Sequence, residues 1–193
     1  MSELEAVNLL LSAIGEAAVS SLETATTVEV TQAKNLLSNV NRAAQQKGWH
    51  FNTEWDVVLT RDADDRMPLS ESILSVYQPG QLMTIRGRSG SMFAYDLDNN
   101  TFTWTKNLNN AVTITLLDFI DTPNTFRQYV TTRAARIFQE EIIGQVSAET
   151  GNRQEEAEAY ADLLDDDAER AGLNVAYGTL DMLNTTQIHR KLW

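Results

Sequence analysis

Apolar side chains recur at helical spacing in the first part of the chain. In residues 2–14 and 28–47 they return every three or four positions, which places them on one side of a helix. Gly15 and Gly48 directly follow these segments, and glycine commonly ends a helix. The pattern predicts two amphipathic helices with these stripes: Leu4, Val7, Leu10, Leu11 and Ile14 in the first, and Ala33, Leu36, Leu37, Val40, Ala43 and Ala44 in the second.

The apolar pattern changes to a period of two between residues 55 and 117, which is typical of strands with one buried face. Glycines in residues 86–90 and Asp and Asn side chains in residues 96–100 favour turns between these strands. We expect an antiparallel meander in which these positions point inward: Trp55, Val57, Leu59, Ile73, Val76, Met83, Ile85, Phe93, Tyr95, Phe102, Trp104, Val112, Ile114 and Leu116.

Helical spacing returns after Thr122 and Pro123, which suit the cap and the first position of a helix. This third helix is expected to carry Phe126, Val130, Ala134, Ile137 and Phe138 on its buried side and to stop at Gly144. A fourth helix is predicted over residues 147–171, with Gly172 ending it and a thin apolar face of Ala157, Tyr160, Leu164, Ala168 and Ala171. The remaining residues have no period and indicate an arm.

Together these segments predict an α+β fold. Residues 1–52 and 118–172 form an antiparallel helical bundle, residues 53–117 form an inserted antiparallel β meander, and residues 173–193 form an extended C-terminal arm. A chain of 193 residues has room for one compact domain with such an insertion. The bundle is expected to close around Leu11, Ile14, Leu36, Val40, Phe126, Val130 and Ile137.

The acidic residues change this picture because they are unevenly spread. The formal net charge is -12, and residues 140–170 hold eleven carboxylates against two arginines. This balance argues against a domain that grips nucleic acid through its phosphates.

The chain has no cysteine, so disulfides and thiolate metal sites are excluded. No apolar run approaches the length of a membrane span, and the acidic N-terminus does not resemble a secretory signal.

Three consecutive aspartates, residues 165–167, lie late in the predicted fourth helix, where the helix dipole disfavours negative charge. A single chain is therefore expected to gain nothing from them. They are either part of a solvated surface or part of a face that borders a polyanion passage or a subunit seam. The candidate acidic face consists of Glu158, Asp162, Asp165, Asp166, Asp167 and Glu169.

Candidate catalytic groups are few, and we predict no catalytic residue, metal site or cofactor. His50 has apolar neighbours and is interpreted as packed or hydrogen-bonded, while His189 lies in the expected arm. The run from Asp96 to Asn100 lacks the glycine and glutamate of a calcium loop and favours a plain turn, and the acids of residues 62–65 favour a solvated loop. The hypothesis of a glycoside hydrolase with two converging carboxylates stays open, because the sequence does not show which acids meet in space.

Three segments resemble tail tubular protein A, the adaptor family of short-tailed podovirus bacteriophages. They are residues 10–22 (LLSAIGEAAVSSL), residues 48–52 (GWHFN) and residues 123–130 together with 134–138, and their order and spacing agree with the family from about residue 4 to 171. The resemblance implies a structural core motif of Gly15, Gly48, Trp49, Phe51, Pro123 and Phe126.

The resemblance also implies the biological role. It predicts a non-enzymatic virion protein that forms a ring, of twelve copies in the family, between the portal protein and a tail nozzle protein of the tail tubular protein B type. Genomic DNA would pass through without sequence-specific binding, a tail fibre would be a further contact, and assembly would take place in the bacterial host cytoplasm without membrane insertion. The expected portal-binding residues are Ile188, His189, Arg190, Lys191, Leu192 and Trp193. The competing hypotheses are a virion-associated cell-envelope hydrolase with paired carboxylates and a small DNA-binding packaging factor.

Overall fold

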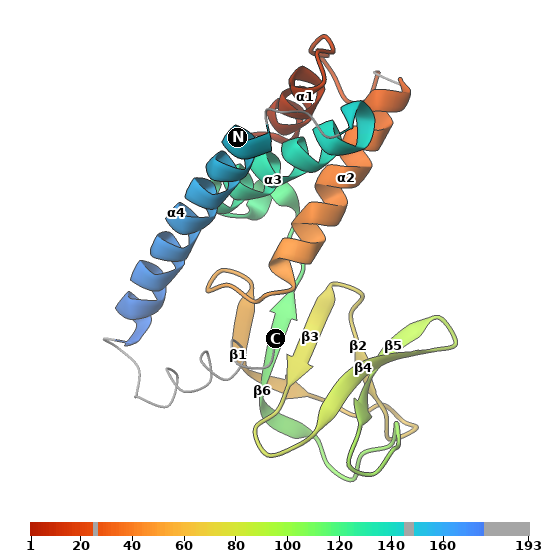
Figure 1. Cartoon of the computed structure of the whole chain (residues 1–193). Coiled ribbons are helices and arrows are strands. Elements are labelled where there is room, and N and C mark those ends of the chain that lie inside the picture. The colour runs from red at the N-terminus through yellow and green to blue at the C-terminus, as the bar shows by residue number, and fades with distance from the viewer. Residues whose placement is uncertain (25–26, 145–148, 176–193) are drawn as a thin grey trace.

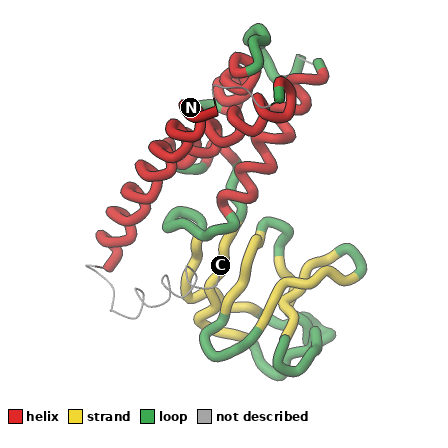
Figure 2. Tube along the Cα trace, in the orientation of Figure 1, coloured by secondary structure: helices red, strands yellow, loops and turns green. Residues whose placement is uncertain are grey.

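The structure is a computed structural model whose helices gather at one end of the molecule and whose strands gather at the other (Figure 1). It describes residues 1–24, 27–144 and 149–175, without side chains at 149–152 and 172–175. Figure 2 shows the same division between helix and strand. The α+β class is confirmed, with the helices α1 (Glu3–Ala13), α2 (Val28–Gln45), α3 (Asn124–Ile143) and α4 (Glu149–Val175), the short 3-10 helix η1 (Phe119–Asp121), and the strands β1 (Thr53–Leu59), β2 (Met67–Leu69), β3 (Ile73–Tyr77), β4 (Met83–Arg88), β5 (Ser91–Asp96) and β6 (Leu108–Thr115).

The helical part is built around α3, which packs against each of the other three helices. Phe126 and Phe138 on α3 are fully buried, and burial of one such side chain stabilises a fold by roughly 1.5 to 3 kcal/mol. The expected bundle core is confirmed: Leu11, Val40, Phe126 and Val130 are buried, and Ile14, Leu36 and Ile137 pack against them.

The ends of α1 follow local chemistry that the sequence displays. Ser2 and Glu5 exchange hydrogen bonds between side chain and backbone, a capping box at the start of the helix. At the other end, the backbone N–H of Glu16 donates to the carbonyl of Leu11 (3.0 Å), which Gly15 permits through its positive φ of 81°. The predicted stop at Gly15 is therefore confirmed.

The start of α3 differs from the prediction in detail. The helix begins at Asn124, and Pro123 takes the cap position without a side-chain hydrogen bond. The hydroxyl of Thr122 donates backward to the carbonyl of Phe119 (2.8 Å) instead of capping α3. The predicted Thr122 cap is wrong because a 3-10 turn directly before the helix captures its side chain.

The strands form two antiparallel sheets of three strands each. The first sheet has the order β1-β6-β3 and the second has the order β2-β5-β4. Antiparallel pairing is confirmed, but the sequential order of a meander holds only for β4 and β5, since β6 inserts between β1 and β3. The predicted strand at Phe102 and Trp104 is reduced to an isolated bridge between Arg66 and Thr103, because Trp104 fills the apolar space between the sheets.

Two predictions about α4 are wrong. The helix continues through Gly172 to Val175. Of its predicted apolar face, Tyr160 and Leu164 do pack against the core, but Ala157 and Ala168 are exposed, and Ala159 and Leu163 are buried instead. Alanines occur on both the buried and the exposed side of α4, so their spacing does not define which side faces α3.

The helices and strands meet where the chain crosses between them twice, after α2 and after β6. The side-chain amide of Asn52 donates to the carbonyls of Gln45 (3.0 Å) and Thr115 (3.1 Å). The side chain of Gln45 bonds both backbone groups of Leu117, each at 2.8 Å. Gln45 and Asn52 are only 0% and 2% exposed, so these buried amides have hydrogen-bond partners in the backbone of both chain segments.

Gly48 in this crossing is expected to tolerate alanine less well than Gly15. Both have positive φ, but a Cβ at Gly48 would lie 2.8 Å from Cδ1 of Ile114, while nothing lies within 4 Å of one at Gly15. Gly15→Ala should cost about 1 kcal/mol for backbone conformation alone, and Gly48→Ala about 1 to 3 kcal/mol more for the added steric conflict. Urea unfolding of both variants measures the difference, and equal losses would contradict the proposed conflict with Ile114.

Candidate functional site

The segment of residues 48–52 forms the tight turn from which α4 is held. The side-chain carbonyl of Asn52 accepts from the backbone N–H of Trp49 (2.8 Å), and the indole N–H of Trp49 donates to the carbonyl of Ala44 (2.8 Å). Phe126 packs edge-on against Trp49 and Phe51, with ring centroids 6.0 and 5.0 Å away. The structure thus brings together Gly48, Trp49, Phe51 and Phe126 of the structural core motif, while Gly15 and Pro123 lie at helix ends.

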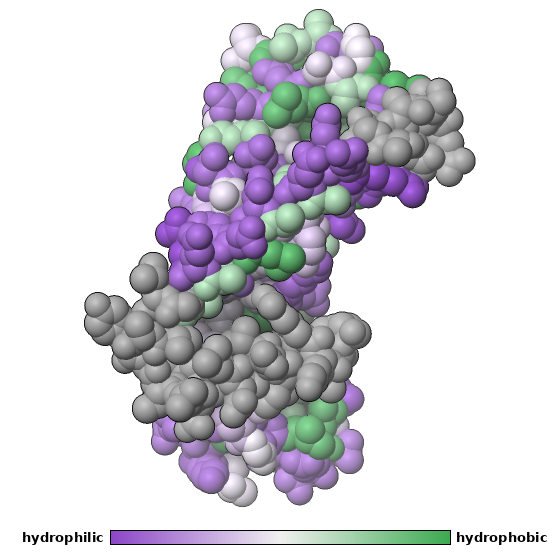
Figure 3. Space-filling model, turned by 60° about the vertical axis from the view of Figure 1, so that its left-hand side comes forward, coloured by the Kyte–Doolittle hydropathy of each residue, from purple (hydrophilic) through white to green (hydrophobic). Residues whose placement is uncertain are grey.

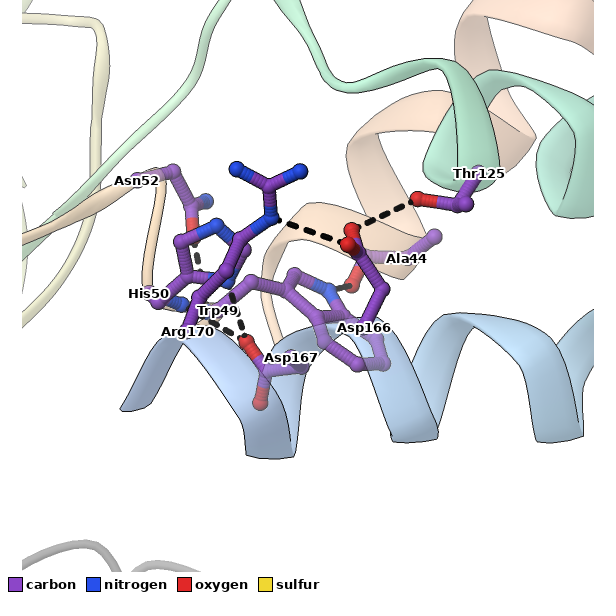
Figure 4. A network of polar contacts seen from close by, with 8 residues as sticks. All are labelled: Ala44, Trp49, His50, Asn52, Thr125, Asp166, Asp167 and Arg170. Atoms are coloured by element: carbon purple, nitrogen blue, oxygen red, sulfur yellow. Dashed lines mark hydrogen bonds and ion pairs between the residues drawn. The ribbon is translucent and has the colours of Figure 1, made fainter. Parts of the chain in front are cut away.

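Two carboxylates of α4 attach the helix to this turn and to α3 (Figure 4). Oδ1 of Asp167 accepts from the backbone N–H of His50 (2.9 Å) and lies 2.8 Å from its ring Nδ1, which carries the proton when the carboxylate is ionised. Oδ2 of Asp166 accepts from the hydroxyl of Thr125 (2.9 Å). We call these contacts the α4 clasp. They confirm the interpretation of His50 as a hydrogen-bonded residue.

Asp166 is the member of the clasp whose protonation equilibrium is clearly displaced. Burial by itself raises the pKa of this carboxyl, but hydrogen bonds from Arg170 (2.9 Å) and Thr125 outweigh burial, so the pKa lies below its ordinary value of 3.8. The ionised form is therefore the form that the fold stabilises. The expectation that a single chain gains nothing from the aspartate triplet is wrong for Asp166 and Asp167.

A second cluster ties the N-terminal half of α4 to α3. The carboxylate of Glu156 accepts from Arg133 (3.1 Å) and from Nε of Arg136 (2.5 Å), and Arg136 also reaches Glu140 (2.7 Å). Burial lowers the pKa of Arg136, but the hydrogen bonds to Glu156 and Glu140 dominate and raise it above its ordinary value. Both halves of α4 are thus attached by charged contacts beside its apolar side.

The opposite side of α4 carries exposed acids at alternating spacings of three and four residues. This surface, the acidic stripe, consists of Glu155, Glu158, Asp162, Asp165 and Glu169, all exposed. Figure 3 shows a largely hydrophilic surface over this side of the helical part. Of the predicted acidic face, Glu158, Asp162, Asp165 and Glu169 lie in the stripe, while Asp166 and Asp167 belong to the clasp.

The other residues singled out from the sequence lie in turns or loops, or outside the described part of the chain. Asp96 accepts two hydrogen bonds from Asn99 within a turn, which confirms the plain-turn interpretation. Burial raises the pKa of Asp96, but these bonds hold it below the ordinary value. Arg61 pairs with Asp65 (2.7 Å) in the predicted solvated loop. The expected portal-binding residues 188–193 lie outside the described residues.

The polar clusters described above attach α4 to α3 and to the turn of residues 48–52, and none of them has a catalytic arrangement. Within residues 1–24, 27–144 and 149–175, no three His, Cys, Asp or Glu side chains are grouped to hold a metal ion. A hollow of about 430 Å³ beside α1 is lined by Met1, Glu5, Asn8 and Leu9, with one carboxylate. No helix in this part of the chain is long and apolar enough to cross a membrane.

The fold and its contacts define an α+β protein whose polar clusters join its own helices and strands and leave other charged side chains exposed. The chain belongs to the tail tubular protein family, whose model matches residues 4–173. The family resemblance deduced from the sequence is therefore confirmed, and the chain is a structural component of a phage tail. A search of curated proteins finds no match.

Asp167→Ala is expected to destabilise the protein by about 1.5 to 3 kcal/mol, because the partly buried N–H of His50 loses a charged acceptor. Asp165→Ala is the matched control, since this neighbouring aspartate is exposed, and its effect should stay within about 0.5 kcal/mol. Chemical unfolding monitored by tryptophan fluorescence measures both. Similar losses for the two variants would exclude a structural role specific to Asp167.

The contribution of Asp166 should depend on pH. Because folding lowers the pKa of this carboxyl, its stabilisation is complete above the ordinary, unfolded-state value of 3.8 and is lost as pH falls through the folded-state value. Asp166→Asn should therefore be less stable than the wild type at pH 6, with the difference shrinking below about pH 4. Urea unfolding at a series of pH values tests this. A difference that is constant with pH would assign the loss to packing.

Proposed function

We propose that the protein is the ring-forming adaptor that joins the portal vertex of a phage head to the tail nozzle and surrounds the channel through which genomic DNA passes. The observation that carries this proposal is the match to the tail tubular protein family across residues 4–173. The match covers both the helical and the strand part, so the whole described architecture belongs to the proposed role. The copies assemble in the host cytoplasm on the portal, with twelve per ring as the resemblance implies.

The charge of the protein suits a channel component. A formal charge of -12 disfavours attachment to DNA phosphates, which would slow the passage of a genome. In the proposed assembly, the acidic stripe faces either the DNA channel or the seam between neighbouring subunits. Retention and ejection of DNA then need no chemistry from this chain, which agrees with the structural character of the family.

Different parts of the chain contact different partners in the proposed assembly. The terminal residues 188–193 contact the portal, with Ile188, Leu192 and Trp193 as apolar anchors and Arg190 and Lys191 as charged contacts. The strand part faces a nozzle of the tail tubular protein B type or a neighbouring subunit, and a tail fibre is a further contact of the assembled ring.

Electron microscopy of negatively stained mixtures tests the adaptor function directly. The wild-type chain mixed with the portal protein encoded by the same genome should add a collar of density to one end of the portal. Each component alone is the control. Portals that stay bare at a several-fold excess of the chain would reject the proposed function.

A chain that lacks residues 187–193 separates portal attachment from folding, because these residues lie outside the described fold. This variant should leave the portals without collars, and thermal unfolding shows whether it is folded. Undiminished collars would reject the assignment of portal binding to the terminal residues.

A further inference from the structure

The second sheet has an outer face that carries Phe93 and Tyr95, so the prediction that both point inward with Ile85 is wrong. Ile85 of β4 lies opposite Ala94 of β5, and both pack into the apolar cluster between the two sheets. Side chains alternate along a strand, so the neighbouring pair, Arg86 opposite Phe93, lies on the other face. Tyr95 lies on this face as well. The outer face therefore combines cationic and aromatic side chains.

Three guanidinium groups lie over three aromatic rings on this face. Arg66 lies 5.0 Å from the ring centroid of Phe93, Arg86 lies 3.7 Å from that of Tyr95, and Arg88 lies 5.4 Å from that of Phe102. The rings also pack edge-on, with Phe102 centred 4.8 Å from Tyr95 and 6.3 Å from Phe93. We call this surface the arginine face. Its stacked guanidinium groups are held in place before any partner arrives.

Two of these arginines have no counter-charge among the described residues. Arg66 pairs with Asp62 and Asp64. In contrast, neither Arg86 nor Arg88 has a carboxylate within ion-pair distance among the described residues, and both are exposed. A guanidinium stacked on a ring still presents its N–H donors at its edge, where a carboxylate binds it with two parallel hydrogen bonds. The arginine face thus fits an anionic partner that presents carboxylates.

We propose that the arginine face binds the acidic stripe of α4 on a second copy of the chain. This inference rests on the proposed ring function and identifies the surfaces that form its subunit seam. The stripe is complementary in charge and chemistry, because its five carboxylates follow one exposed edge of a helix. Asp162 and Asp165 form no ion pair within the described residues, so they are available to Arg86 and Arg88.

The positions of the two surfaces exclude a contact within one chain. Figure 1 shows α4 along one side of the molecule and the second sheet on the other side. The arginine face points away from the first sheet, since the apolar cluster fills the space between the sheets. Two different surfaces that face apart form a head-to-tail contact between copies, and such contacts close into a ring when the rotation between copies divides the circle.

Charge reversal on each surface tests the contact with full-length protein and the portal protein of the same genome. Arg86→Glu/Arg88→Glu and, separately, Asp162→Lys/Asp165→Lys should each lower the fraction of collared portals about tenfold, because like charges then meet at the seam. Combining all four substitutions in one chain exchanges the charges of both surfaces and keeps the net charge of the wild type. This variant should restore collars to near the wild-type level.

Lys34→Glu/Arg42→Glu on α2 is the matched control, since it changes the net charge as much as the arginine pair does but lies outside the strand part. It should leave the collars unchanged. Thermal unfolding shows whether each variant is folded. If the arginine variant is unfolded, the Asp162 and Asp165 variant tests the same seam from the other side, where both replaced side chains are exposed.

The outcomes separate this inference from the proposed function. A wild-type chain that forms no collar rejects the adaptor function. If the wild type forms collars and a folded double variant forms them equally well, only the arginine-face contact is overturned. The same holds if the fourfold variant fails to restore the collars. If Arg86→Glu/Arg88→Glu forms normal collars but no longer binds a double-stranded DNA fragment that the wild type binds, the arginine face is a nucleic-acid surface. This result would also overturn the proposed contact.

Discussion

Two buried side-chain amides, those of Gln45 and Asn52, hold the crossing on which the rest of the structure depends. The chain leaves the helices after α2 and returns after β6. These amides form hydrogen bonds with the backbone of both connecting segments. An amide carries both a donor and an acceptor, so it serves a backbone N–H and a carbonyl together. Apolar side chains of similar size would leave these backbone groups without their protein partners, at a cost of about 1 to 3 kcal/mol where the group is buried, as the carbonyl of Gln45 is.

The position of α4 follows from this crossing. The turn of residues 48–52 presents the backbone N–H and ring of His50 toward Asp167, while Trp49 packs beneath the helix, with its ring 6.4 Å from that of Tyr160. A shift of the turn would therefore displace the helix that carries the acidic stripe. The amide crossing fixes the strands relative to the helices, and the α4 clasp extends this order to the outer surface.

Charge has two physical roles on the same helix. Carboxylates on the inner side of α4 receive hydrogen bonds from α3 and from the turn, in places where water is largely excluded and such bonds are strong. Carboxylates on the outer side face solvent and contribute little to folding. Their proposed value lies in assembly, where a partner surface that excludes water and supplies arginines would make the same groups bind. The net charge of -12 thus combines groups that maintain the fold with groups available for partners.

The sequence by itself determined the class of fold, the ends of α1 and α3 at glycines and the core of the helical part, because these depend on periodicity and on local backbone preferences. Its family resemblance also indicated a phage tail protein. Only the tertiary structure decided the strand order, the buried side of α4, the separate roles of Asp165 and Asp167 and the arginine face. These features join residues far apart in the chain, as His50 and Asp167 are, and alanines around α4 leave no clear period. Contacts of that kind depend on how the elements pack, which local patterns do not encode.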